Sequence, residues 1–206
     1  MAELILIGGG SCSGKTTIAS ALCRVLGDDA LQISTDNFYK GFDPERKCCR
    51  KGFNFDRPDA VDFELLLEVM QKLKAGESAA IPDYDFTSHT RTDKIIEVYP
   101  KDYIILEGIF ALYSRELLMM ATKSIYVDCG VDIAIRRRIE RDSVSRSRDV
   151  CDVVEQFLDT VLPMYYEYVE PTRELADLIV DGKEPIEGAV NKIMEILGKG
   201  GNLTKV

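Results

Sequence analysis

The stretch Gly9-Gly10-Ser11-Cys12-Ser13-Gly14-Lys15-Thr16 fits the pattern G-x-x-x-x-G-K-[ST] and directly follows the apolar run Leu4–Ile7. A strand that delivers such a turn to the start of a helix is the setting in which this pattern binds nucleoside triphosphates. Glycine lets the backbone turn tightly, so that successive N–H groups and the helix N-terminus surround the phosphates. An ordinary glycine-rich turn is the alternative, and the strand and helix on either side argue against it.

The polar side chains of this phosphate loop have distinct expected roles. We expect Lys15 to be an exposed loop lysine that reaches the β- and γ-phosphates, and Thr16 to offer its hydroxyl to Mg²⁺. The expected nucleotide-binding residues are Gly9, Gly10, Ser11, Cys12, Ser13, Gly14, Lys15, Thr16 and Thr17.

Composition limits the class of protein. A chain of 206 residues with 46% hydrophobic content can bury one sizeable core, so a single domain over residues 1–206 is predicted. A net charge of −9 argues against a nucleic-acid partner. No apolar run is long enough to span a membrane and the start lacks the basic residues of a signal peptide, so we expect a cytoplasmic protein. Six cysteines without a C-x-x-C pair and one histidine favour reduced thiols over a zinc site.

The order of apolar segments predicts an α/β fold. Short apolar or β-branched runs alternate with helical periodicity, which is typical of a parallel sheet covered on both faces. Five strands are expected, at Leu4–Ile7, Leu31–Ser34, Tyr103–Leu106, Ser124–Val127 and Leu178–Val180. Helices are expected at about Lys15–Leu26, Asp62–Ala75, Asp132–Asp142, Asp152–Tyr168 and Pro185–Leu197.

One segment departs from this alternation. Residues 79–100 are bounded by proline and alternate over short distances, which predicts a β-hairpin insertion that forms a wall over a substrate. The aromatic and polar residues inside it, Tyr84, Phe86 and His89, fit either cross-strand packing or ligand contact.

Two acidic residues follow apolar strands. Asp36 lies just beyond the end of Leu31–Ser34, at the sheet edge where open α/β folds bind ligands. It is suited to accept a proton from an attacking hydroxyl, although a turn-capping role is the alternative. Glu107 ends Tyr103–Leu106 and corresponds in position to the acid that holds Mg²⁺ in phosphate-loop enzymes.

Arginine is concentrated between residues 136 and 150. Two interpretations fit this pattern: a solvated helix face paired with neighbouring acids, or a lid whose guanidiniums stabilise charge on a transferred phosphoryl group. Arg138 and Arg141 are three apart and share a helix face, whereas consecutive arginines do not. The arginines of this stretch are Arg136, Arg137, Arg138, Arg141, Arg146 and Arg148.

Taken together, these segments resemble the uridine kinase family, also called uridine–cytidine kinases, over about Leu4 to Gly182. The resemblance rests on GGSCSGKTT, STDNFY, NFDRPDAVDF, IPDYDFTSHTR, ILEGIF, RRRIERD followed by RSRD, and YVEPTRELAD. It implies a phosphate-loop kinase fold with a five-stranded parallel sheet, flanking helices, a β-hairpin and a mobile arginine-rich lid, often assembled as a tetramer. Ser147, where the family usually has glycine, and Gly130, where an acid is common, depart from the pattern.

The resemblance also implies roles for individual residues. Asp36 resembles the catalytic carboxylate, and Thr16 and Glu107 resemble the Mg²⁺ partners. Asp56 matches the acid that binds the ribose hydroxyls, although a helix-capping role is equally compatible with its pattern. Tyr84 and His89 match the residues that recognise the pyrimidine edge, Phe86 is the apolar contact between them, and the lid and ribose positions are matched by Arg138, Arg141, Arg146, Arg148 and Gln156.

The resulting hypothesis is a kinase that transfers the γ-phosphate of ATP or GTP to the 5′-hydroxyl of uridine and cytidine, with Mg²⁺, in pyrimidine salvage. In it Asp36, Lys15, Arg141 and Arg146 are the catalytic residues. The nearest alternative is a kinase of the same fold acting on nicotinamide riboside, ribulose phosphate or pantothenate. A nucleotide-dependent switch is disfavoured because no N-K-x-D segment is present, and an RNA-binding protein is disfavoured by the acidic balance.

Overall fold

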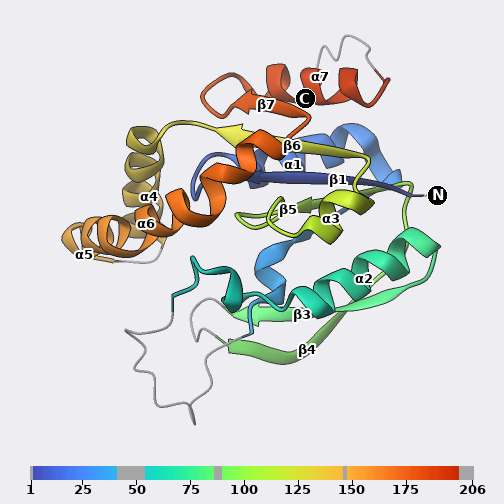
Figure 1. Cartoon of the computed structure of the whole chain (residues 1–206), viewed down its shortest axis with the longest axis horizontal. Helices are drawn as coiled ribbons and strands as arrows, with labels where there is room; N and C mark the ends of the chain where they lie inside the picture. Colours follow the sequence, from blue (N-terminus) through green and yellow to red (C-terminus); the bar gives the residue numbers. More distant parts are fainter. Residues whose placement is uncertain (1, 41–53, 86–89, 146–147, 200–206) are drawn as a thin grey trace.

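The computed structural model describes residues 2–40, 54–85, 90–145 and 148–199, and five parallel strands form its central sheet (Figure 1). Their order across the sheet is β2-β5-β1-β6-β7. The predicted parallel sheet is therefore confirmed, and each predicted strand falls inside an observed one. The strands are β1 (Glu3–Gly9), β2 (Ala30–Ser34), β5 (Tyr103–Glu107), β6 (Lys123–Asp128) and β7 (Leu178–Asp181).

The strand register brings the polar ends of three strands to one edge. Glu107, the last residue of β5, pairs with Ile7 of β1 on one side and with Ser34 of β2 on the other. The phosphate loop that follows β1 and Asp36 that follows β2 consequently lie at the same edge as Glu107. Ligands of open parallel sheets bind at this carboxyl edge.

Successive side chains of β1 point to opposite faces of the sheet and so enter two separate parts of the core. Ile5 and Ile7 pack with α1 (Lys15–Leu26) and α7 (Ile186–Ile196), whereas Leu4 and Leu6 pack with α2 (Phe63–Ala75) on the opposite face. All four of these β1 side chains are fully buried. A strand that is apolar on both faces is expected for a parallel sheet covered by helices on both sides.

Three of the predicted helices agree closely with the structure: α1, α2 and α7. The fourth, α4 (Val131–Ser145), extends one residue earlier and three residues later than predicted. The prediction of one regular helix over Asp152–Tyr168 is wrong in detail. That stretch is α5 (Val150–Gln156), the π-helical η5 (Phe157–Val161), α6 (Leu162–Met164) and the π-helical η6 (Tyr165–Val169), with Pro163 between the two π-helical segments.

The sequence patterns also missed α3 (Arg115–Met120). Its six residues are too few to show a helical period, although Ser114 caps it by accepting a hydrogen bond from the Leu117 N–H at 3.3 Å. Short 3₁₀ turns fill other connections: η1 (Gly27–Asp29), η2 (Thr35–Phe38), η4 (Pro58–Ala60) and η7 (Glu170–Leu175).

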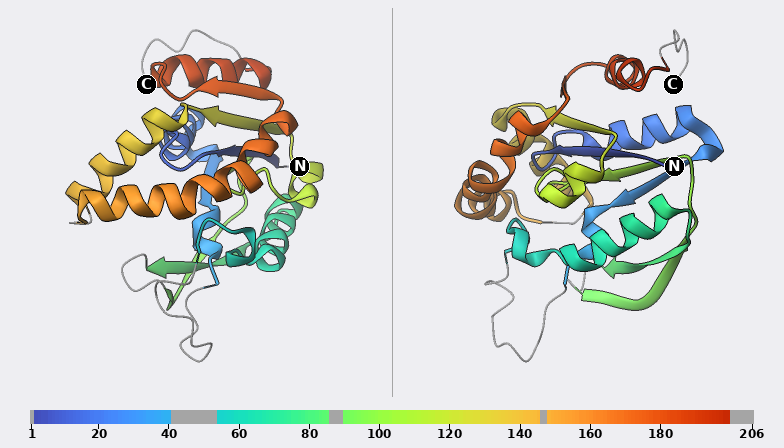
Figure 2. Two further views of the ribbon diagram at one scale, coloured as in Figure 1. Left: turned by 60° about the vertical axis from the view of Figure 1, so that its left-hand side comes forward. Right: turned by 45° about the vertical axis from the view of Figure 1, so that its right-hand side comes forward.

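The predicted hairpin is present as β3 (Ala79–Asp85) and β4 (Thr90–Val98), which pair antiparallel. Arg91 of β4 fixes it beside the main sheet by donating hydrogen bonds to the carbonyls of Tyr39 at 2.8 Å and Phe38 at 3.1 Å. Figures 1 and 2 show the hairpin together with α2 at one end of the molecule and α7 at the other. The hairpin therefore borders the carboxyl edge near Asp36.

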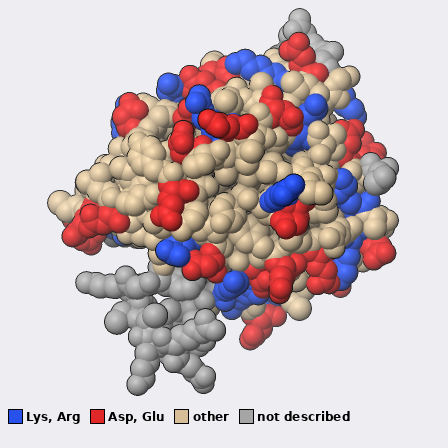
Figure 3. All heavy atoms as spheres, in the orientation of Figure 1, with Lys and Arg blue, Asp and Glu red and all other residues tan. Residues whose placement is uncertain are grey.

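Two further observations concern the surface. Within the described ranges, the helices are all too short or too polar to cross a membrane. On the face drawn in Figure 3, acidic and basic side chains are interspersed over the described part of the chain.

Candidate active site

The phosphate loop connects β1 to α1 through strained backbone positions. Gly9 has φ 134°, and a Cβ built there would lie 2.3 Å from the Val127 carbonyl oxygen, so only glycine fits. Gly14 precedes α1 in a left-handed conformation, and Cys12 is the only described non-glycine residue with a positive φ, at 60°. Such strain is stored where the surrounding structure fixes a functional conformation.

Lys15 is buried, contrary to the expected exposed loop lysine. Only 6% of the residue is accessible, and its Nζ donates a 2.6 Å hydrogen bond to the carbonyl of Gly10. Burial lowers the pKa of Lys15, while the charges of Glu107 and Asp36 act in the opposite direction. The ammonium is thus held inside the loop next to two carboxylates.

Thr16 and Glu107 meet as predicted for a shared cation site. Thr16 Oγ1 donates a 3.1 Å hydrogen bond to Glu107 Oε2, and Glu107 is 4% exposed. A hydroxyl and a carboxylate are hard oxygen donors, and Mg²⁺ is usually held by one or two carboxylates together with substrate phosphates. The described residues contain no group of three His, Cys, Asp or Glu side chains that could hold a metal alone. The pair therefore fits Mg²⁺ bound jointly with a nucleotide.

Asp36 lies in η2, directly after β2. Its N–H donates to Ser34 Oγ at 3.3 Å, which fixes the turn. Burial and, next in size, the charge of Glu107 raise the pKa of Asp36 to about 6, against the lowering effect of Lys15. A carboxyl group with this pKa changes its charge close to neutral pH.

Two cavities meet at Asp36. The first, which we call the phosphate-loop cavity, has a volume of about 470 Å³ and is bordered by the loop, Asp36, Glu107 and Arg141. Six predicted nucleotide-binding residues line it: Ser11, Cys12, Gly14, Lys15, Thr16 and Thr17. The other three predicted nucleotide-binding residues, Gly9, Gly10 and Ser13, belong to the same loop but do not line this cavity.

The second, which we call the aromatic cavity, has a volume of about 180 Å³. Its apolar wall is formed by the rings of Tyr39, Phe55 and Tyr84, with centroids 5.4 Å apart for Tyr39–Phe55 and 5.5 Å apart for Tyr39–Tyr84. Its polar wall contains the predicted residues Asp56, Arg138, Arg148 and Gln156. Asp36 and Arg141 line both cavities.

Three arginines of the stretch 136–150 converge on Asp142, which is fully buried. Its carboxylate lies 2.8 Å from Arg141 Nε, 3.7 Å from Arg138 Nε and 3.6 Å from Arg148 Nη1. Arg148 also donates a 2.7 Å hydrogen bond to Gln156 Oε1. One acid therefore gathers three cations, each of which also lines the aromatic cavity.

The described arginines of this stretch differ in their surroundings. Arg136 is an exposed partner of Glu140, as in a solvated helix face, whereas Arg138, Arg141 and Arg148 line the cavities. Three predicted site residues lie outside the described residues: Phe86, His89 and Arg146. Of the two positions that depart from the family pattern, Ser147 also lies outside the described residues, and Gly130 directly precedes α4.

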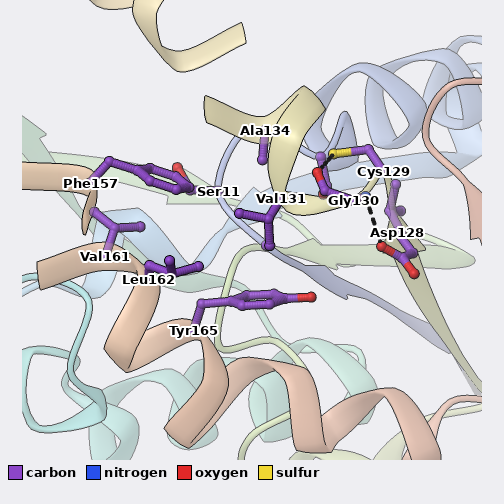
Figure 4. A pocket seen from close by; sticks show the side chains of 13 residues that line it. Ser11, Asp128, Cys129, Gly130, Val131, Ala134, Phe157, Val161, Leu162 and Tyr165 are labelled. Carbon is purple, nitrogen blue, oxygen red and sulfur yellow. Dashed lines mark hydrogen bonds between the residues drawn. The ribbon is translucent and has the colours of Figure 1, made fainter. Parts of the chain in front are cut away.

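A third, much smaller cavity lies behind the phosphate loop (Figure 4). Its volume of about 30 Å³ is far smaller than that of either other cavity. Phe157, Val161 and Tyr165 reach it from the π-helical segments, and the Tyr165 ring would lie 3.1 Å from a Cβ built on Gly10. Only a residue without a Cβ therefore fits at Gly10 unless the Tyr165 ring moves.

Several residues of the site were not identified from the sequence. Tyr39 and Phe55 supply rings to the aromatic cavity, and Thr160 borders it from η5. Asp142 pairs with arginines of α4 and of the segment after it, and Arg137 joins α4 to the phosphate loop. The spacing of Arg138 and Asp142, four residues apart on one helix, is a sequence signal that could have indicated this ion pair.

Comparison with known proteins identifies the family of the chain. The sequence matches the Phosphoribulokinase / Uridine kinase family over residues 4–185. The chain belongs to this family. The kinase is 43% identical to a uridine kinase of Lactobacillus johnsonii over 200 residues, covering 94% of this chain and 95% of the relative. It is 40% identical to a uridine kinase of Staphylococcus aureus over 191 residues, covering 92% and 90%.

Solved structures share the fold of the kinase. A putative fructose transport system kinase from a Silicibacter species superposes with a TM-score of 0.74 at 22% identity, covering 87% of this chain and 89% of that one. A possible uridine kinase from Bacillus stearothermophilus gives a TM-score of 0.61 at 23% identity, with the same coverage. At these identities the likeness establishes a phosphate-loop kinase fold. Membership of such a kinase family implies a nucleotide phosphate donor and Mg²⁺.

Proposed function

We propose that this chain is a nucleoside kinase that transfers the γ-phosphate of ATP or GTP to the 5′-hydroxyl of uridine and cytidine, giving UMP and CMP. One observation carries the proposal: Asp36 is part of the wall of both the phosphate-loop cavity and the aromatic cavity. A donor phosphate in one cavity and a hydroxyl in the other meet at this carboxylate. Phosphoryl transfer needs this juxtaposition of two substrates more than it needs covalent chemistry by the protein.

Asp36 serves in this proposal as the base that orients and deprotonates the hydroxyl. A general base works best when its pKa lies near the working pH, and the pKa of about 6 satisfies this. Burial and the neighbouring charge of Glu107 raise the pKa of Asp36 to this value. Glu107, which borders the phosphate-loop cavity, therefore also adjusts the pKa of the base.

Donor binding is assigned to the phosphate loop. Lys15 neutralises phosphate charge from inside the loop, and Arg141 places a guanidinium at the junction of the cavities. Thr16 and Glu107 hold Mg²⁺, which when bound neutralises charge on the donor phosphates. Arg146 is retained as a lid residue of the transition state on the basis of the family resemblance.

Acceptor binding is assigned to the aromatic cavity. Asp56 lies in its wall, and burial raises the pKa of Asp56 while Arg138 and Arg141 oppose that shift. We assign Asp56 to the ribose hydroxyls, Tyr84 and His89 to the pyrimidine edge, Phe86 to its face, and Arg138, Arg148 and Gln156 to positioning of the ribose. The names of the L. johnsonii and S. aureus relatives support uridine over other acceptors.

The second candidate function is phosphorylation of another small molecule by a kinase of the same family. It is considered because the family description also names phosphoribulokinase. Three aromatic rings around a cavity of about 180 Å³ favour a flat base over ribulose phosphate.

We further propose that the chain assembles as a homotetramer. This proposal rests on the resemblance to the uridine kinase family, and light scattering of the purified protein measures the oligomeric state.

The test is product identification. The purified protein is incubated with Mg²⁺, uridine and either ATP or GTP, and the products are separated and assigned by ³¹P NMR. We expect uridine 5′-monophosphate, and little donor hydrolysis when uridine is omitted. Phosphate on another hydroxyl, or no nucleotide product with either donor, would refute the proposal.

A further inference from the structure

Three consecutive arginines of α4 contact three different surroundings. Arg136 is exposed and its Nε lies 3.4 Å from Glu140 Oε1. Arg138 is buried and donates to Ser11 Oγ at 3.2 Å and to Gln156 Oε1 at 3.4 Å. An α-helix turns about 100° per residue, so neighbouring side chains leave it in different directions. Arg137 takes the third direction, toward the rear of the phosphate loop.

The guanidinium of Arg137 contacts three backbone carbonyls. Its Nη1 lies 3.4 Å from the oxygen of Cys12 and 3.3 Å from that of Ser13, and its Nη2 donates to the oxygen of Gly182 at 2.9 Å. The planar fork of arginine suits several acceptors held in fixed positions, and a lysine ammonium does not reproduce it. One side chain thus joins α4 to two separate loops.

Both loops border the phosphate-loop cavity. Gly182 follows β7, and its backbone packs so closely on the phosphate loop that a Cβ built there would lie 2.1 Å from the Ser13 oxygen. Gly182 N–H donates to Asp128 O at 2.7 Å, which ties the same turn to β6. Arg137 lines the phosphate-loop cavity itself and is absent from the wall of the aromatic cavity as described.

Holding these carbonyls fixes the peptide groups of the loop. In a planar trans peptide the N–H points opposite to the C=O, so the contact at Ser13 O sets the direction of the Gly14 N–H. A charged donor on the carbonyl also polarises the peptide and strengthens its N–H as a donor. Both effects favour the anionic phosphates that a loop of this kind binds.

We propose that Arg137 is a positioning residue for the phosphate donor. It locks the phosphate loop and the turn at Gly182 in the arrangement that binds the triphosphate, whereas its neighbour Arg138 serves the acceptor cavity. The inference rests on the proposed function for the identity of the two cavities. It assigns to Arg137 a selective effect on donor affinity.

The experiment uses the full chain and measures binding by calorimetry. The variants are Arg137→Ala and Arg137→Lys, with Arg136→Ala as the matched control from the exposed face of the same helix. The probes are a non-hydrolysable ATP analogue with Mg²⁺ and, separately, uridine. We expect Arg137→Ala to weaken analogue binding about 10- to 100-fold, with Arg137→Lys intermediate and Arg136→Ala unchanged. Uridine affinity should stay within about twofold of the wild type in all three variants.

Other results overturn the inference. Unchanged analogue affinity in Arg137→Ala excludes a donor role, and equal weakening of both ligands shows a general effect on the lid. Loss of folding in both Arg137 variants shows that the residue is structural support only. The analogue is tested without an acceptor, so the two proposals can fail separately. A wild type that binds the analogue but does not phosphorylate uridine refutes the proposed function. The role of Arg137 is then still decided by the analogue affinities of the variants. A wild type that does not bind the analogue refutes both.

Discussion

Thr16 Oγ1 donates a 3.1 Å hydrogen bond to Glu107 Oε2, joining the first turn of α1 to the end of β5. Two chain segments 91 positions apart thus supply one pair of hard oxygen donors beside the phosphate loop. The pair forms because β1 and β5 are neighbours in the sheet and Glu107 pairs with the last residues before the loop.

Replacing either member of this pair should raise the Mg²⁺ requirement. We expect Glu107→Gln and Thr16→Ala to increase the Mg²⁺ concentration for half-maximal rate about 10- to 100-fold at fixed ATP, the range for lost metal-site partners. The control is Glu97→Gln, which neutralises an exposed carboxylate on β4. Initial rates across a Mg²⁺ titration measure the effect. An unchanged titration curve in Glu107→Gln would remove the metal assignment.

Asp36 should impose an acid limb on the pH–rate profile. Because the base acts only when deprotonated, kcat/KM of the wild type should fall as the pH drops through about 6. Asp36→Asn should lower kcat by about 10²–10⁴-fold and abolish this limb, while uridine still binds. An Asn variant that retains both the rate and the limb would show that another group is the base.

The same substitution should stabilise the fold near neutral pH. The pKa of Asp36 is higher in the folded protein than its ordinary value of 3.8, so the folded state binds the proton more tightly than the unfolded state. The resulting stability is present at low pH and is lost as the pH rises through about 6. Asp36→Asn removes this loss, and we expect its Tm to exceed that of the wild type by roughly 2–8 °C at pH 8.

Thermal melts between pH 5 and pH 8 measure this advantage, which should shrink as the pH falls. An advantage that is constant over the range, or that grows toward pH 5, would contradict the raised pKa.

Asp142 should be the most costly acid to remove from the lid region. Its buried carboxylate pairs with Arg138, Arg141 and Arg148, so Asp142→Asn leaves three cations to repel one another. Breaking a buried pair costs about 3–5 kcal/mol, which lowers Tm by roughly 6 °C or more in a chain of this size. The KM for uridine should rise as well, because Arg138 and Arg148 line the aromatic cavity.

The control for Asp142 is Glu140→Gln on the same helix. Glu140 pairs with Arg136 at the surface, with 64% of its side chain exposed, and such pairs contribute at most about 1 kcal/mol. Calorimetric melting and uridine kinetics compare the two variants. Equal Tm values for both variants would show that Asp142 does not organise the arginines.

Features with a strong period or a rigid spacing were predictable from the sequence. The sheet followed from apolar runs of three or four residues, and the meeting of Thr16 with Glu107 followed from two strands that end at one edge. The β-hairpin followed from a change of period between Ala79 and Pro100. These features depend on local pattern and on the geometry of parallel sheets.

Features set by tertiary packing were not predictable. Nothing local distinguishes Lys15 as buried, because its surroundings come from Glu107 and Asp36 in other segments. The π-helical turns on either side of Pro163 were not predicted, because such turns are rare and occur inside otherwise α-helical segments. Arg136, Arg137 and Arg138 are identical in the sequence, and only their contacts separate one solvated side chain from two at the cavities.

The central claim is that the acceptor is a nucleoside with a pyrimidine ring. Measuring kcat/KM for a panel of nucleosides with ATP and Mg²⁺ tests this claim most directly. A site that hydrogen-bonds a pyrimidine edge leaves its polar groups unpaired when another base enters. We predict that uridine and cytidine exceed adenosine and nicotinamide riboside by about 10²-fold or more, and that His89→Ala raises the uridine KM without changing the ATP KM. A wild-type preference for adenosine or nicotinamide riboside would contradict the pyrimidine assignment.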